Sequence, residues 1–137
     1  MPSVLEELAK FVGAGNLRLC LDCSLLASDL ESEINELIDA MEDADWDMAL
    51  HHLGLAEAIG KELVKKGCIE REFIDDFLSD VKDKYELCEI LYKQSRMSKE
   101  DWGELWETEL DDIVRGPLIR KASDLHALIV LKSCGRR

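Results

Sequence analysis

A regular apolar spacing between residues 20 and 41 restricts the fold of this chain more than any other feature of its sequence. The residues with this spacing are Cys20, Cys23, Ala27, Leu30, Ile34, Leu37 and Met41. Alternating steps of three and four place every member on one face of an α-helix, here over three heptads. The spacing predicts a long helix that begins near Asn16. This helix is either the central helix of an antiparallel bundle or the contact stripe of a dimer.

Five further segments have helical periodicity, and no segment of useful length alternates as a strand would. The predicted helices are a short one from Ser3 to residue 12, then 46–66, 70–93, 98–115 and 118–133. Asp45 and Ser98 are suitable N-caps, Gly67 is a suitable stop signal, and Gly116-Pro117 is expected to end the helix before it. The predicted fold is therefore all-α. It is a compact bundle of five or six helices in one domain, 1–137, with the central helices antiparallel because their connections are short.

The periodicity also predicts which side chains face the core. In 46–66 the inward stripe is Ala49, Leu53, Ala56, Gly60 and Leu63. In 70–93 it is Phe73, Ile74, Phe77, Val81, Cys88 and Leu91. In the segment after Ser98, one broad face with two tryptophans is predicted from Trp102, Leu105, Trp106, Leu110 and Ile113. This aromatic face is either core or a surface for a partner.

Charge is distributed unevenly along the chain. The net charge is −13, but residues 1–112 hold 11 basic and 29 acidic residues (−18), whereas 113–137 hold six basic and one acidic (+5). An acidic body argues against nucleic-acid and membrane-surface binding. We expect the basic C-terminal helix to pack on the acidic body of the same chain or, as the second choice, to dock on a protein partner or a second copy.

The sequence predicts a cytoplasmic protein. It has no recognisable secretory signal and no apolar run long enough to cross a membrane. Five cysteines at irregular spacing predict free thiols in a reducing compartment. The high charged content, with a single Gln and two Asn, is a mild thermophile-like bias, and intracellular disulfides do occur in such organisms.

Cysteine and histidine residues form the first candidate for a chemical site. Cys20 and Cys23 have the C-x-x-C spacing of zinc and redox sites, but both fall on the apolar stripe, which favours buried core thiols. His51 lies four residues after Asp47, and His52 lies in line with the apolar residues of its helix. An ion pair and a half-buried core histidine explain these two residues, so no cofactor is predicted.

A second candidate rests on carboxylates. Glu33-Ile-Asn-Glu36, followed by Leu37-Ile-Asp-Ala and an acidic turn, is similar to the first half of the all-α nucleoside triphosphate pyrophosphatases of the MazG type. The resemblance covers about thirty residues and implies a Mg²⁺ site of four carboxylates that orients a water on a phosphate. The expected E-x-x-D on the next helix is missing, and Glu72 and Asp75 would have to supply the second pair.

The leading functional prediction is a non-enzymatic helical interaction or adaptor protein, oligomeric or part of a complex. No catalytic residue is assigned. The predicted contact residues are the aromatic pair and the basic residues after it, namely Trp102, Trp106, Arg115, Arg120 and Lys121. A Mg²⁺-dependent phosphohydrolase and a Cys/His metal or redox protein are the two alternatives.

Overall fold

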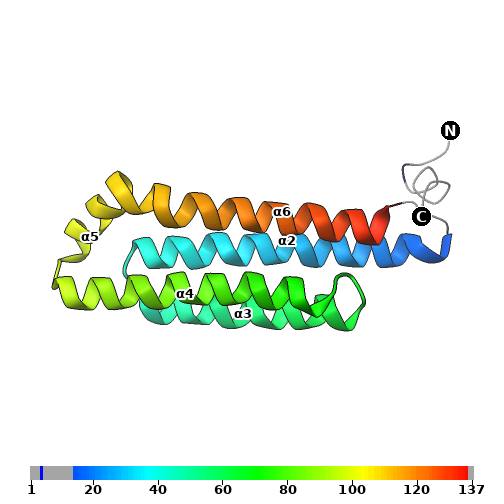
Figure 1. The fold of residues 1–137 in the computed structure, drawn as a ribbon, viewed down its shortest axis with the longest axis horizontal. Coiled ribbons are helices and arrows are strands. Elements are labelled where there is room, and N and C mark those ends of the chain that lie inside the picture. Colours follow the sequence, from blue (N-terminus) through cyan, green and yellow to red (C-terminus); the bar gives the residue numbers. More distant parts are fainter. Residues whose placement is uncertain (1–3, 5–13, 136–137) are drawn as a thin grey trace.

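Four long helices lie side by side and alternate in direction (Figure 1). They are α2 (Ala14–Glu42), α3 (Trp46–Lys65), α4 (Arg71–Ser95) and α6 (Gly116–Cys134). The computed structural model describes residue 4 and residues 14–135, and this part of the chain contains no strand. The all-α class is confirmed, with four packed helices in place of the predicted five or six. Apart from Val4, the helix predicted from Ser3 lies outside the described residues.

The heptad stripe forms the centre of the core. All seven of its residues, from Cys20 to Met41, are buried, and α2 packs against both α3 and α6. The predicted stripe of α3 is also buried without exception, from Ala49 to Leu63. The stripe that predicted either a bundle or a dimer is thus covered by helices of the same chain.

Capping residues and one glycine mark the turns between the helices. Asp45 caps α3 by accepting a hydrogen bond from the Met48 amide at 3.2 Å. Gly67 has a φ of +78°, the left-handed conformation that a glycine adopts at no steric cost, in the turn before α4. Ser98 accepts from the Asp101 amide at 3.1 Å and so caps α5 (Lys99–Leu105). These three sequence signals predicted the helix boundaries correctly.

The predicted break at Gly116-Pro117 is wrong. The chain stays helical from α5 through the π-helix η1 (Trp106–Arg115) into α6. Pro117 lies in the first turn of α6, where a proline is tolerated, and so does not end the helix there. The wider π turns keep Trp106, Leu110 and Val114 inward, whereas Ile113, predicted to face inward, is 60% exposed.

The inward face of α4 is narrower than predicted. Ile74, Phe77, Val81 and Cys88 are buried as expected, together with Tyr85, which the sequence analysis did not select. Phe73 and Leu91 are exposed. An apolar residue at the edge of a helix stripe is buried only if the neighbouring helix approaches it closely, and α4 makes few close backbone approaches to α6.

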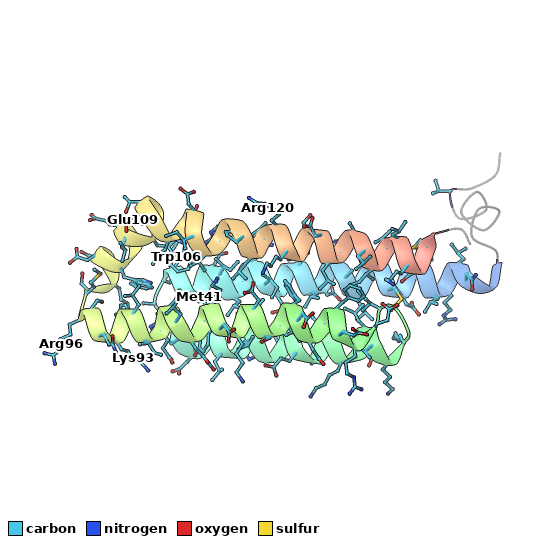
Figure 2. The ribbon with its side chains drawn as sticks, viewed as in Figure 1. Met41, Lys93, Arg96, Trp106, Glu109 and Arg120 are labelled. Atoms are coloured by element: carbon cyan, nitrogen blue, oxygen red, sulfur yellow. A yellow bond between two sulfur atoms is a disulfide. The ribbon has the colours of Figure 1, made fainter. Side chains whose placement is uncertain are left out.

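One end of the bundle is closed by aromatic packing. Rings of Trp46, Tyr85, Tyr92, Trp102 and Trp106 contact one another with centroid separations of 5.3–6.1 Å. The Trp102 indole N–H donates to the Met41 carbonyl at 2.8 Å, which joins α5 to the end of α2. Figure 2 shows Met41 and Trp106 close to the end where α5 crosses the bundle. Within the described residues, the Trp46 indole nitrogen is buried without a hydrogen-bond acceptor.

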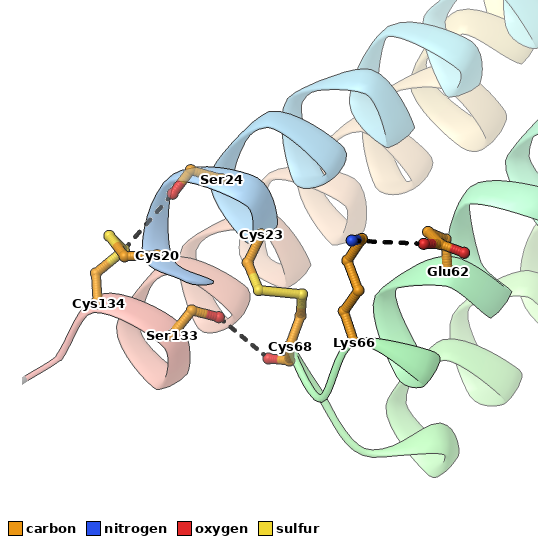
Figure 3. The surroundings of a disulfide bond; sticks show 8 residues. All are labelled: Cys20, Cys23, Ser24, Glu62, Lys66, Cys68, Ser133 and Cys134. Atoms are coloured by element: carbon orange, nitrogen blue, oxygen red, sulfur yellow. Dashed lines mark hydrogen bonds and ion pairs between the residues drawn. A yellow bond between two sulfur atoms is a disulfide. The ribbon is translucent and has the colours of Figure 1, made fainter. Parts of the chain in front are cut away.

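The opposite end is closed by two disulfides, so the prediction of free thiols is wrong for four of the five cysteines. Cys20 is bonded to Cys134 at the end of α6, and Cys23 to Cys68 in the turn between α3 and α4 (Figure 3). The up-and-down topology brings the start of α2, this turn and the end of α6 together (Figure 1). Only Cys88 keeps a free thiol, which is buried as predicted.

None of the helices in the described part of the chain combines the length and the apolar character that a bilayer crossing needs.

Candidate binding groove

A groove of about 750 Å³ runs along the outside of the bundle between α3 and α4. Its floor is apolar and consists of Gly60 and Val64 from α3 with Ile74 and Leu78 from α4. A Cβ atom on Gly60 would lie 2.8 Å from the Ile74 Cγ2, so the glycine permits the close approach of the two helices there. The volume lies within the range typical of ligand sites in proteins.

The rim of the groove is basic, although the chain as a whole carries −13. Four exposed cations line it, namely Lys61, Lys65, Arg71 and Lys82, against two carboxylates, Glu57 and Asp75. Across the described part of the chain, none of these four cations has a carboxylate within ion-pair distance. The groove is therefore a local cationic site on an acidic protein.

The register of the two helices shows where the excess positive charge lies. Gly60 faces both Ile74 and Leu78, and the helices run antiparallel, so Lys65 lies level with Arg71 beside the interhelical turn. In the same register Lys61 lies level with Asp75, and Glu57 and Lys82 line the far end of the groove. The two lining carboxylates thus lie in the part of the groove that holds Lys61 and Lys82, and no lining carboxylate is level with Lys65 and Arg71, so the excess positive charge is concentrated at the Lys65–Arg71 end.

The predicted tryptophan contact face lies in the core. Trp102 and Trp106 are both fully buried, with 0% of their surface exposed. The Trp106 indole N–H donates to the Asp111 carboxylate at 3.2 Å. Because these side chains fill the aromatic end of the bundle, they offer no surface to a partner in this structure.

The basic C-terminal segment packs on the acidic body: the apolar face of α6 is buried, chiefly against α2, and its cations form ion pairs to α2 and α4. The Arg115 guanidinium lies 3.0 Å from the Asp39 carboxylate, 3.6 Å from Glu42 and 2.8 Å from Asp111. Lys121 pairs with Asp80 at 2.8 Å and Lys132 with Glu70 at 2.9 Å. Of the three predicted basic contact residues, Arg120 alone is exposed without an ion pair among the described residues.

Two of these acidic partners have shifted pKa values of opposite sign. Burial raises the pKa of Glu42, and the neighbouring carboxylates of Asp43, Asp111 and Asp39 add to the shift, while Arg115 opposes it. The hydrogen bond from Lys132 lowers the pKa of Glu70. Burial lowers the pKa of Arg115, but its hydrogen bonds to Asp39 and Asp111 outweigh this effect and raise it overall.

The carboxylates of the pyrophosphatase hypothesis are not brought together. The Glu33 carboxylate accepts a hydrogen bond from His52 Nδ1 at 2.7 Å, which links α2 to α3. Glu36 is exposed on α2, while Glu72 and Asp75 are exposed on α4. No group of three or more metal-binding side chains occurs in the part of the chain that the structure describes.

The cysteine and histidine hypotheses are also changed by the structure. The sulfurs of Cys20 and Cys23 are engaged in disulfides to different partners, which removes them as zinc ligands in this state. His126 lies against Glu31 on α2, so two histidines from different helices contact neighbouring carboxylates of α2. The sequence predicted His52 as half-buried, which agrees with its 17% side-chain exposure, but gave no signal for either partner.

No pattern in the sequence predicted the groove. The small residue Gly60 on an otherwise larger stripe was a usable signal of close helix approach, but the cations around it come from two helices whose register was unknown. Comparison of the chain with models of known protein families, with curated proteins and with solved structures gave no match.

Proposed function

We propose that this chain is a helical interaction or adaptor protein that binds a helix of a partner protein in the groove between α3 and α4. The observation that carries the proposal is the combination of an apolar floor with a cationic rim, none of whose four cations is within ion-pair distance of a carboxylate among the described residues. Helix-in-groove recognition needs such an apolar trough between two helices, with polar side chains along its edges.

The other predicted contact surfaces have less support. The heptad stripe and the tryptophan face are covered by the chain's own helices, which removes the main reason for expecting self-association. The basic residues of η1 and α6 are largely paired with carboxylates of α2 and α4. An adaptor role and a cytoplasmic location remain predictions that rest on the groove and on the sequence.

A site-specific photo-crosslinker tests the proposal. Benzoylphenylalanine replaces Ser79, which is exposed and lines the groove, and in a matched variant it replaces Ser123, which is exposed on α6. We expect irradiation in extract of the native cell to give a discrete adduct from position 79 and not from position 123. The adduct is identified by mass spectrometry, and the purified partner is titrated against the full-length protein by calorimetry.

Equal labelling from the two positions, or an adduct from position 123 alone, would contradict a groove interface. Light scattering of the purified protein provides an independent check of self-association. A stable dimer whose formation is abolished by Ser79→Trp would assign the groove to a second copy of this chain.

A further inference from the structure

We infer that the partner segment is a short amphipathic helix whose carboxylates are concentrated at one end, and that this acidic end lies beside Lys65 and Arg71. The inference rests on the proposed function and adds the chemistry and the direction of the bound helix. It follows from the length, the openness and the charge distribution of the groove.

The length of the groove sets the size of the occupant. On α3 the lining extends from Glu57 to Lys65, nine residues separated by eight rises, or about 12 Å of helix. Anchors at positions i, i+3 or i+4, and i+7 of a bound helix span about 10 Å, so three apolar side chains fit along the floor of Val64, Gly60 and Leu78. A helix of three to four turns supplies these anchors.

The open rim favours a helix over a small amphiphile. Lys61, Lys65, Arg71 and Lys82 are all exposed along both edges, so an occupant is covered from below and remains open to solvent above. Small-molecule sites usually enclose most of their ligand. A helix has a polar face that can remain in water while its apolar face covers the floor.

The charge distribution sets the direction. The uncompensated cations lie at the Lys65–Arg71 end, whereas carboxylates accompany the cations along the rest of the groove. The net charge of −13 repels a uniformly acidic partner, so the favoured segment carries few carboxylates. These carboxylates lie at the end of the segment that contacts Lys65 and Arg71. Oppositely charged groups at the edge of an interface fix its register and orientation.

Synthetic helical peptides of about four turns test this inference with the full-length, disulfide-bonded protein. The probe peptide has leucines at i, i+3 and i+7 and two glutamates in its terminal turn, and the control peptide has lysines in place of these glutamates. We expect saturable binding of the acidic probe by fluorescence anisotropy, and binding of the lysine peptide weaker by about tenfold or more.

Protein variants locate the contact. Ser79→Trp fills the groove and should abolish probe binding, whereas Ser123→Trp on α6 should not change it. The double variant Lys65→Glu/Arg71→Glu should weaken binding about tenfold and reverse the preference between the two peptides. Arg120→Glu, an exposed cation of α6 outside the groove, should have no effect. Circular dichroism melts confirm that each variant is folded.

The outcomes separate this inference from the proposed function. Equal affinity for both peptides, or an equal loss with Arg120→Glu, would overturn the assigned charge contact. If neither peptide binds while the crosslinker at position 79 still captures a partner, the interaction proposal stands and the acidic-helix inference fails. A third outcome is that dodecanoate binds below its micellar concentration, that Ser79→Trp abolishes this binding, and that no peptide binds. This outcome would make the groove a site for an amphiphilic anion and overturn the inference.

Discussion

Two glycines on the same helix should respond differently to the same substitution. Gly54 and Gly60 both lie within α3, where alanine is a better helix former than glycine by about 1 kcal/mol. A Cβ on Gly54 meets nothing within 4 Å, so Gly54→Ala should stabilise the protein by about 1 kcal/mol. For a chain of this size the melting temperature should rise by about 3–5 °C.

At Gly60 the same methyl group has no space. It would lie 2.8 Å from Ile74 Cγ2 and 3.2 Å from Leu78 Cδ1, against a normal carbon–carbon contact of about 3.5–4.0 Å. Ile74 is 3% exposed and stiff at χ1, so α4 itself has to move. Such overpacking costs about 1–3 kcal/mol, which cancels or exceeds the gain in helix propensity. Gly60→Ala should therefore be about 1–3 kcal/mol less stable than Gly54→Ala.

Urea denaturation of the two variants and the parent protein, followed by circular dichroism at 222 nm, measures this difference. The parent slope should be retained in both variants, because neither substitution changes the surface exposed on unfolding. Equal stabilisation by the two substitutions would refute the close approach of α3 and α4 at Gly60. It would also remove the floor of the groove as described.

Three further results are expected. Replacing Cys20 and Cys134 together by serine opens a 114-residue loop and should lower the free energy of unfolding by about 2–4 kcal/mol. Urea titrations without reductant measure the loss, and an unchanged denaturation midpoint would contradict the Cys20–Cys134 bond. Burial raises the pKa of Cys88 to about 11, so a thiol reagent at pH 8 should label no cysteine in the native protein and one in denaturant. Because the pKa of Glu42 is raised in the folded protein, ionisation of this carboxyl lowers the free energy of unfolding as pH rises above about 4.5. Glu42→Gln should therefore stabilise the protein at pH 7 by less than about 1 kcal/mol and have no effect at pH 3. Thermal melts at both pH values measure the difference.

Periodicity predicted the parts of the fold that depend on one helix at a time. The stripe from Cys20 to Met41 and the stripe from Ala49 to Leu63 are buried residue for residue, because a helix places i, i+3 and i+4 on one face whatever it packs against. The caps at Asp45 and Ser98 were equally local signals. Where the structure departs from the prediction, the cause is the way in which two helices pack against each other.

The disulfides illustrate what local patterns miss. Their partners are 114 and 45 residues apart in sequence, and C-x-x-C spacing draws attention to the wrong pair. An up-and-down arrangement of the predicted helices would have placed Cys20, Cys23 and Cys68 at one end, but the wrongly predicted break at Gly116-Pro117 put Cys134 at the other end. The groove was missed for the same reason, because its cations meet only once the register of α3 and α4 is known.

The contrast between the two ends of the bundle has a consequence for its internal motion. At one end covalent bonds fix α2 to α6 and to the turn before α4. At the other end the helices are held only by ring contacts, hydrogen bonds and ion pairs, and the buried Trp46 indole nitrogen lacks an acceptor among the described residues. Local thermal opening should therefore be most frequent at the aromatic end and least frequent beside the disulfides. Amide hydrogen exchange should slow along the long axis from the aromatic end toward the disulfides. The Lys65–Arg71 end of the groove borders the Cys68 turn and belongs to the stiff half of the molecule. A surface that is already ordered loses little conformational entropy when a ligand arrives.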